Sequence, residues 1–105
     1  MSGKELLPMN TKQRFTHSKV FIYRTIAGES LIIPVFGQNV SMDDLYALNE
    51  VGSFIWKAME TPISVEELFH LVADEYDQDF ETIVSDVSEF ISSMEEIGAI
   101  VEVIE

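Results

Sequence analysis

The chain has 105 residues, 47% of them hydrophobic, and this composition predicts one folded domain with a hydrophobic core rather than a disordered chain. It contains no cysteine, which excludes disulfides, thiolate chemistry and cysteine-based metal sites. The net charge of −13 is unevenly spread: residues 1–42 hold five basic and two acidic residues, and residues 43–105 hold one basic and seventeen acidic residues. This negative field argues against nucleic acid and anionic membranes as partners, and favours a basic partner or simply solubility.

Residues 1–18 are polar and mixed, which predicts a loosely ordered N-terminal tail ahead of a domain over residues 19–105. The chain shows no charged-then-apolar signal at its start, and no apolar run approaches the about 18 residues that a membrane span needs. We therefore expect a cytoplasmic protein.

Three short β-rich segments are predicted in the first half of the chain, over residues 20–26, 31–36 and 45–48. A turn containing Gly28 separates the first two, because glycine adopts positive φ at little cost. Pro34 has no N–H to give to a ladder, so the second segment is expected at a sheet edge or a bulge.

Three helices are predicted after these strands. Asn49 can cap a helix that runs to Met59, and residues 64–67 have the S-x-x-E form of a capping box before apolar residues at helical spacing. A longer helix follows from Phe80, with apolar residues at three- and four-residue steps until Gly98. The predicted fold class is α+β, a winged helix-turn-helix with a three-stranded antiparallel sheet followed by three helices, and the sheet must leave strand edges open.

The second helix of this helix-turn-helix has no Lys or Arg, although a DNA-reading helix needs positive charge near the major groove. Its charged residues are all acidic: Glu81, Asp86, Glu89, Glu95 and Glu96. The pattern predicts the architecture of a DNA-binding protein without that function.

The search for catalytic and ligand-binding motifs is negative. His17 and His70 lie far apart without ligand spacing, and the acidic turn over residues 74–81 lacks the glycine of a calcium loop. The sequence has no Gly-x-Ser-x-Gly elbow and no glycine-rich phosphate loop. We therefore expect a protein that is not an enzyme, with no cofactor and no metal.

An ordered set of short motifs extends over about residues 20–102. The motifs are Leu48-Asn49-Glu50-Val51-Gly52, Phe54-Ile55-Trp56, Ser64-Val65-Glu66-Glu67-Leu68, Tyr76-Asp77, Asp86-Val87, Phe90-Ile91 and Gly98-Ala99-Ile100-Val101. Together these motifs resemble the PqqD-like family. Members of this family serve pyrroloquinoline quinone biosynthesis and act as recognition elements for precursor peptides in ribosomal peptide (RiPP) modification. The polar N-terminal extension and the long connection over residues 37–44 favour a member that acts in another peptide pathway.

The resemblance implies that the third strand accepts the leader of a precursor peptide as an added strand, packed against the third helix. The residues that match this groove are Leu45, Tyr46, Ala47 and Leu48 on the strand, and Ile83, Asp86, Val87, Phe90, Ile91 and Met94 on the helix. Asp43 and Asp44, together with Asp86, can attract basic residues of the peptide and speed the encounter. A free strand edge suits this role because a peptide gains affinity through its main chain.

The sequence thus predicts a non-catalytic adaptor that presents a leader peptide to a modifying enzyme, such as a radical-SAM protein or a protease, and acts through proximity. The main alternative is an acidic interaction subunit that binds a basic protein. A winged-helix transcription factor and an unrecognised small enzyme are further alternatives. The free edge can also pair with a second copy of the chain, which would give a homodimer that competes with the peptide.

Overall fold

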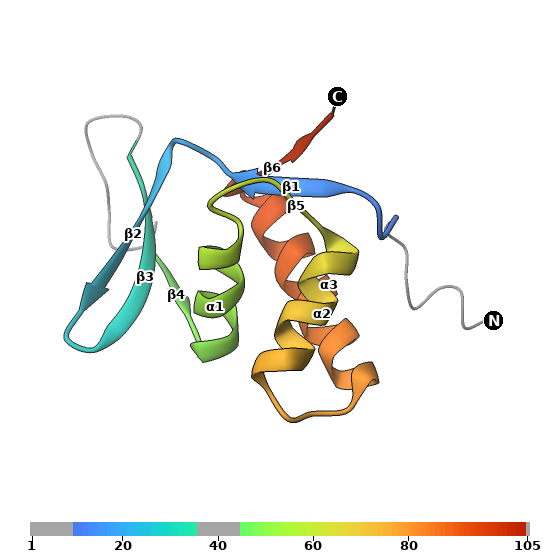
Figure 1. Ribbon diagram of the computed structural model, residues 1–105. Coiled ribbons are helices and arrows are strands. Elements are labelled where there is room, and N and C mark those ends of the chain that lie inside the picture. The colour runs from blue at the N-terminus through green and yellow to red at the C-terminus, as the bar shows by residue number, and fades with distance from the viewer. Residues whose placement is uncertain (1–9, 36–44, 105) are drawn as a thin grey trace.

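The computed structural model describes residues 10–35 and 45–104. Its elements in chain order are β1 (Arg14–His17), β2 (Phe21–Ile26), β3 (Glu29–Pro34), β4 (Tyr46–Leu48), α1 (Glu50–Ala58), β5 (Ile63–Ser64), α2 (Val65–Glu75), α3 (Phe80–Glu96) and β6 (Ile100–Val103). The α+β class, with a three-stranded antiparallel sheet followed by three helices, is confirmed. Helix α1 lies between the β2–β3–β4 sheet and the α2–α3 pair (Figure 1).

The first two helices begin at the residues that the sequence predicts. The side chain of Asn49 accepts a hydrogen bond from the Gly52 backbone N–H at 2.7 Å, which caps α1. Ser64 and Glu67 form the complete capping box of α2, with each side chain accepting from the other residue's backbone N–H at 3.0 Å. These bonds satisfy backbone donors that have no partner inside a helix.

Helix α3 ends at a Schellman motif around Gly98. This glycine has φ of 80°, its N–H donates to the Glu95 carbonyl, and the Ala99 N–H donates to the Met94 carbonyl. The left-handed residue turns the chain sharply, so the next residues leave the helix and form β6. The sequence predicts that the helix ends at Gly98, but it does not predict this strand.

A second sheet, ordered β5-β1-β6, lies across one end of the three helices (Figure 1). It differs from the predicted loose tail over residues 1–18, because Arg14–His17 pairs antiparallel with both β5 and β6. Phe15 is only 1% exposed, and the ring of His17 stacks on that of Trp56 with centroids 4.0 Å apart. Residues 14–17 therefore belong to the fold, and residues 1–9 lie outside the described part.

The β2–β3–β4 sheet places β3 in the centre, so the prediction that Pro34 puts this segment at an edge or a bulge is wrong. Pro34 is the last residue of β3, and pairing with β4 extends only over residues 30–32. The Val35 N–H donates to the Val20 carbonyl at 2.8 Å. Because bonded and non-bonded pairs alternate along an antiparallel ladder, the Pro34 nitrogen faces the β4 side, beyond the last paired residue.

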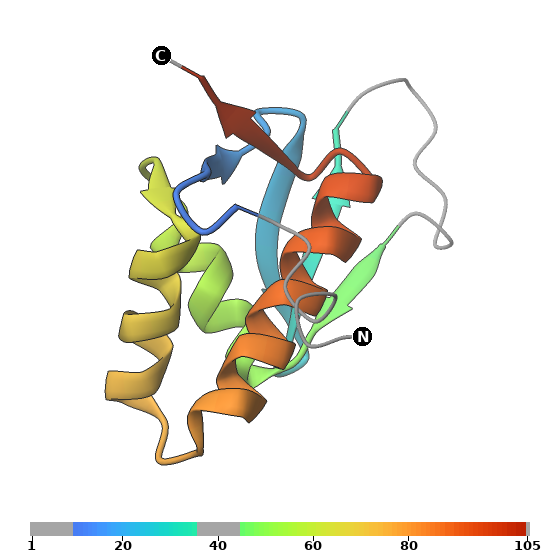
Figure 2. The same cartoon turned by 90° about the vertical axis from the view of Figure 1, so that its right-hand side faces the viewer.

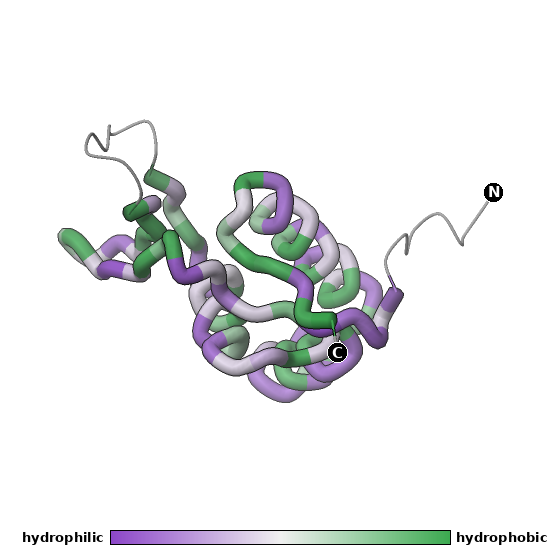
Figure 3. The backbone as a smooth tube through the Cα atoms, turned by 90° about the horizontal axis from the view of Figure 1, so that it is seen from above, coloured by the Kyte–Doolittle hydropathy of each residue, from purple (hydrophilic) through white to green (hydrophobic). Residues whose placement is uncertain are grey.

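The hydrophobic core joins the helices to one face of each sheet. Hydrophobic and hydrophilic residues alternate along the helices and strands, as amphipathic elements require (Figure 3). The buried side chains are those of Phe15, Phe21, Ile32, Ile55, Trp56, Met59, Val65, Leu68, Phe69, Val72, Ile83, Val87, Ile91, Met94, Ala99 and Ile100. This core fixes the position of α3 relative to the sheet.

Candidate functional site

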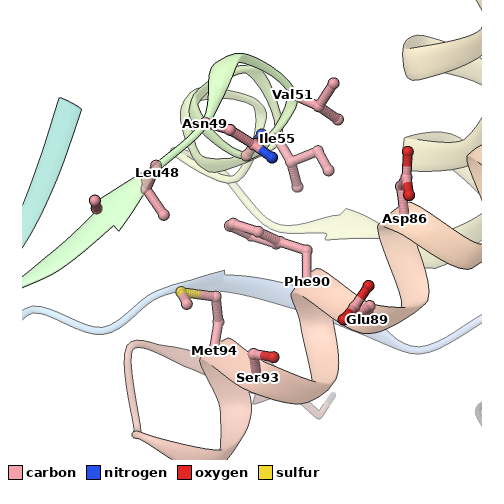
Figure 4. Close-up of a pocket in the computed structure, with 11 residues that line it drawn as sticks. Leu48, Asn49, Val51, Ile55, Asp86, Glu89, Phe90, Ser93 and Met94 are labelled. Carbon is pink, nitrogen blue, oxygen red and sulfur yellow. Dashed lines mark hydrogen bonds between the residues drawn. The ribbon is translucent and has the colours of Figure 1, made fainter. Parts of the chain in front are cut away.

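A groove of about 440 Å³ lies between β4 and α3, closed on one side by the first turns of α1. The two elements run side by side in opposite directions (Figure 2). Apolar side chains from all three elements line the groove, and polar groups line its rim (Figure 4). The lining residues are Ala47, Leu48, Asn49, Val51, Gly52, Ile55, Asp86, Glu89, Phe90, Ser93 and Met94.

The outer side of β4 is a free strand edge in the described part of the chain, since β3 is the partner on its other side. The register pairs Ala47 with Leu31, between the pairs that Tyr46 and Leu48 form with residues of β3. The hydrogen bond from the Val35 N–H to the Val20 carbonyl shows which residues of β3 bond to β2 and which bond to β4. Because hydrogen-bonded and non-hydrogen-bonded pairs alternate in an antiparallel sheet, Tyr46 and Leu48 form the hydrogen-bonded pairs with β3 and Ala47 forms the non-hydrogen-bonded pair. The N–H and C=O of Ala47 therefore point away from β3, toward the free edge.

Phe90 forms the centre of the groove wall. Its ring projects from α3 toward Leu48 and the start of α1 (Figure 4). A Cβ atom at Gly52 would lie 3.3 Å from Phe90 Cε1 and 3.1 Å from Asn49 Oδ1, closer than ordinary van der Waals contact. Glycine at this position thus allows the ring to lie against the α1 backbone, and the close approach sets the depth of the groove.

The charge of the groove is negative. Among residues 10–35 and 45–104, its lining contains two carboxylates, Asp86 and Glu89, and no basic side chain. Lys57, the single basic residue of 43–105, lies on a different side of α1, with its ammonium 5.3 Å from the centre of the Tyr23 ring. Asp86 lies in the N-terminal half of α3 and Glu89 near its middle, so the acids lie toward one end of the groove, whereas Met94 and Ser93 lie toward the other (Figure 4).

The structure brings together five of the residues that the sequence analysis assigns to the site. These are Ala47, Leu48, Asp86, Phe90 and Met94.

The other predicted helix residues lie elsewhere. Ile83, Val87 and Ile91 are buried in the core and do not line the groove. On the strand side, Tyr46 packs against the core, Leu45 is half-buried just before β4, and neither lines the groove. Asp43 and Asp44 lie outside the described residues.

Six lining residues are missing from the prediction: Asn49, Val51, Gly52, Ile55, Glu89 and Ser93. The spacing of α3 contains a signal for two of them. The stripe at positions 83, 87 and 91 is entirely apolar and packs inward, so the positions beside it at 86 and 90 lie at the boundary of the core and those at 89 and 93 face outward. The contribution of α1 depends on the tertiary contact between Gly52 and Phe90, which no local pattern reveals.

A second, more open hollow of about 860 Å³ shares Ala47, Leu48 and Asn49 with the groove and extends between α1 and the β2–β3 hairpin. Here the Tyr23 hydroxyl lies 2.8 Å from Ser30 Oγ. Hydrogen bonding of the hydroxyl to Ser30, and next to Ser53, lowers the pKa of Tyr23 to about 8, and the positive charge of Lys57 makes a smaller contribution.

We expect Tyr23 to ionise before Tyr76 when the pH is raised, because hydrogen bonding lowers the pKa of Tyr23 and burial raises the pKa of Tyr76. Ultraviolet phenolate absorbance should show a first step at about pH 8. Tyr23→Phe should remove this step, whereas Tyr76→Phe, which also removes one phenol, should leave it. A first step that survives Tyr23→Phe would contradict the assignment.

Within the described ranges, no group of three or more His, Asp or Glu side chains is arranged to hold a metal ion. Nor does any helix there combine the length and the apolar character that crossing a membrane requires. The groove itself presents the outer edge of β4, an apolar wall and two carboxylates.

Comparisons with known proteins give one family and one solved structure. The structure titled "TbiB1 in Complex with the TbiA(beta) Leader Peptide" is similar in fold, with a TM-score of 0.64 and 21% sequence identity over 81% of this chain and 93% of that chain. No curated protein matches. Residues 38–100, more than half of the chain, match the family described as Coenzyme PQQ synthesis protein D (PqqD). The chain therefore belongs to the PqqD family.

Proposed function

We propose that this protein is a non-catalytic adaptor that holds the leader of a ribosomally made precursor peptide as a strand added to β4. The observation that carries the proposal is the outer edge of β4, which has no strand partner among the described residues and toward which the N–H and C=O of Ala47 point. An extended peptide that pairs with this edge gains main-chain hydrogen bonds, and its alternate side chains enter the groove against α3.

The family and the fold support this function. PqqD-like proteins act in peptide modification, and the TbiB1 structure of similar fold contains a leader peptide. The adaptor would present its peptide to a modifying enzyme, such as a radical-SAM protein or a protease. Its contribution to the reaction would be the high local concentration of the peptide beside the enzyme, with no bond chemistry in this chain.

The test is an NMR titration of the ¹⁵N-labelled chain with a leader peptide of a precursor encoded beside its gene. The chemical shifts of the backbone amides are measured at each step of the titration. We expect the largest shifts at residues 45–48 and along 86–94. A scrambled leader of identical composition is the control, because it keeps the charge but loses the alternation of side chains. Shifts confined to residues 10–18 or to α2 would show that the peptide binds elsewhere.

The same titration separates the proposal from the acidic interaction subunit. A protein that binds any basic partner through its overall charge should respond equally to the leader and to its scrambled form. If a second copy of the chain pairs through β4, the free protein should be a dimer that the leader converts to monomer. Sedimentation with and without the leader measures this competition.

A further inference from the structure

The residues that line the groove change in chemical character along its length, from acidic to apolar, which the strand edge alone does not explain. Asp86, Phe90 and Met94 lie on one stripe of α3, four residues apart, and all three line the groove. Each step along this stripe covers about 6 Å, at about 1.5 Å per helical residue. Two residues of an extended peptide cover about 6.6 Å, so alternate peptide side chains match successive residues of the stripe.

The side chains that enter the groove are set by the pleat. The peptide residue paired with Ala47 directs its side chain to the same face as Ala47, and its two neighbours direct theirs to the face of Tyr46 and Leu48. That face carries Ile32, which is buried beneath the helices. The neighbours of the paired residue therefore point toward α3.

We infer that the groove selects a peptide strand with a basic residue at one end and apolar residues two and four positions away; the inference rests on the proposed strand addition. The basic side chain lies beside Asp86 and Glu89, and the apolar side chains contact Phe90 and Met94. Charge complementarity supports this occupant, since the groove lining holds two acids and no base. An acidic residue at the same position would meet like charge, which costs affinity.

The order of the basic and apolar residues in the bound peptide shows whether the peptide runs antiparallel or parallel to β4. Strand β4 runs opposite to α3 (Figure 2), and Leu48 lies beside Phe90 and Met94, with Asp86 farther along α3 (Figure 4). The direction of β4, continued past Leu48, therefore leads toward Asp86. A peptide added antiparallel to β4 starts at the Asp86 end and carries its basic residue N-terminal to the apolar ones. A parallel peptide carries it C-terminal to them.

The test is selection from a display library of random twelve-residue peptides on the full chain, followed by affinity measurements on the selected peptides. We expect enrichment of Lys or Arg two and four positions from apolar residues. Asp86→Lys should lower the affinity of these peptides about tenfold. Replacing the basic residue of the peptide by Glu should restore the affinity for the Asp86→Lys variant. Glu95→Lys is the matched control, since it makes the same charge change on an exposed position of α3 outside the groove.

Two failures are distinguishable in this experiment. If the selected peptides lose binding with Ala47→Pro but show no basic preference, strand addition stands and the charge selectivity is wrong. If Asp86→Lys and Glu95→Lys weaken binding equally, the overall field selects basic peptides and the inference fails. If Ala47→Pro leaves all selected peptides bound, the peptides do not add to β4, and the proposed function fails as well.

Discussion

Replacing Ala47 with proline is expected to lower leader affinity roughly tenfold to hundredfold while the helical core stays folded. Proline has no N–H, and the N–H of Ala47 points to the free edge rather than to β3. The added strand would keep an unpaired carbonyl at its centre, which costs about 1–3 kcal/mol. The β3–β4 bonds come from the pairs on either side, so the substitution removes no internal hydrogen bond of the sheet. Fluorescence anisotropy with a labelled leader measures the affinity.

Ala47→Val is the matched control for this variant. Valine keeps the backbone donor and favours the extended conformation, so it should bind the leader with affinity similar to that of the original chain. Circular dichroism should show the same helix content for both variants. Equal leader affinity in Ala47→Pro and Ala47→Val would show that no hydrogen bond forms at this edge.

The helices are the part of this fold that the sequence predicts best, because their signals are local. Asn49, Ser64 and Gly98 each act within a few residues of their own position, and each acts as predicted. The sheet of β5, β1 and β6 is different, because it joins segments from both ends of the chain. Strand β1 has only four residues, and Phe15 is the single apolar one, so the segment shows too little alternation to predict a strand whose partners are distant.

The wrong prediction that Pro34 places its segment at a sheet edge or a bulge also arises because the partners of a strand lie far away in the sequence. The rule that proline avoids central strands concerns the missing donor, and it constrains only the side to which that donor would point. Here that side is the β4 side, where pairing has already ended at Ile32. The sequence shows the proline but does not show how short β4 is. It therefore cannot show that Pro34 lies beyond the last residue of β3 that pairs with β4.

The candidate site is also predicted only in part from the sequence, because part of it depends on tertiary structure. The resemblance to a family places the site on the third strand and third helix, yet it assigns both faces of that helix to the groove. The structure separates them: Ile91 is 0% exposed in the core, whereas Phe90 is half-buried and lines the groove. Neighbouring residues on one helix thus have different roles, which depend on the rotation of α3 about its axis.

This separation predicts opposite effects for two adjacent alanine substitutions. Ile91→Ala should lower the free energy of unfolding by about 2–5 kcal/mol, because it leaves a cavity among side chains that pack on every side. Phe90→Ala should cost less stability than the about 3–5 kcal/mol typical of a fully buried phenylalanine, since part of its ring faces the open groove. It should instead weaken leader binding, because the central apolar contact of the groove is lost.

Urea unfolding and leader titration on the same two variants provide the measurement. At temperatures where both variants are folded, Ile91→Ala should bind the leader nearly as well as the original chain, and Phe90→Ala should bind it at least about tenfold more weakly. A loss of binding that follows the loss of stability in both variants would mean that the groove has no separate contact surface on α3. Weak binding in Phe90→Ala with a stable fold would identify this ring as the residue that the peptide contacts, and the stripe containing Asp86 and Met94 as its continuation.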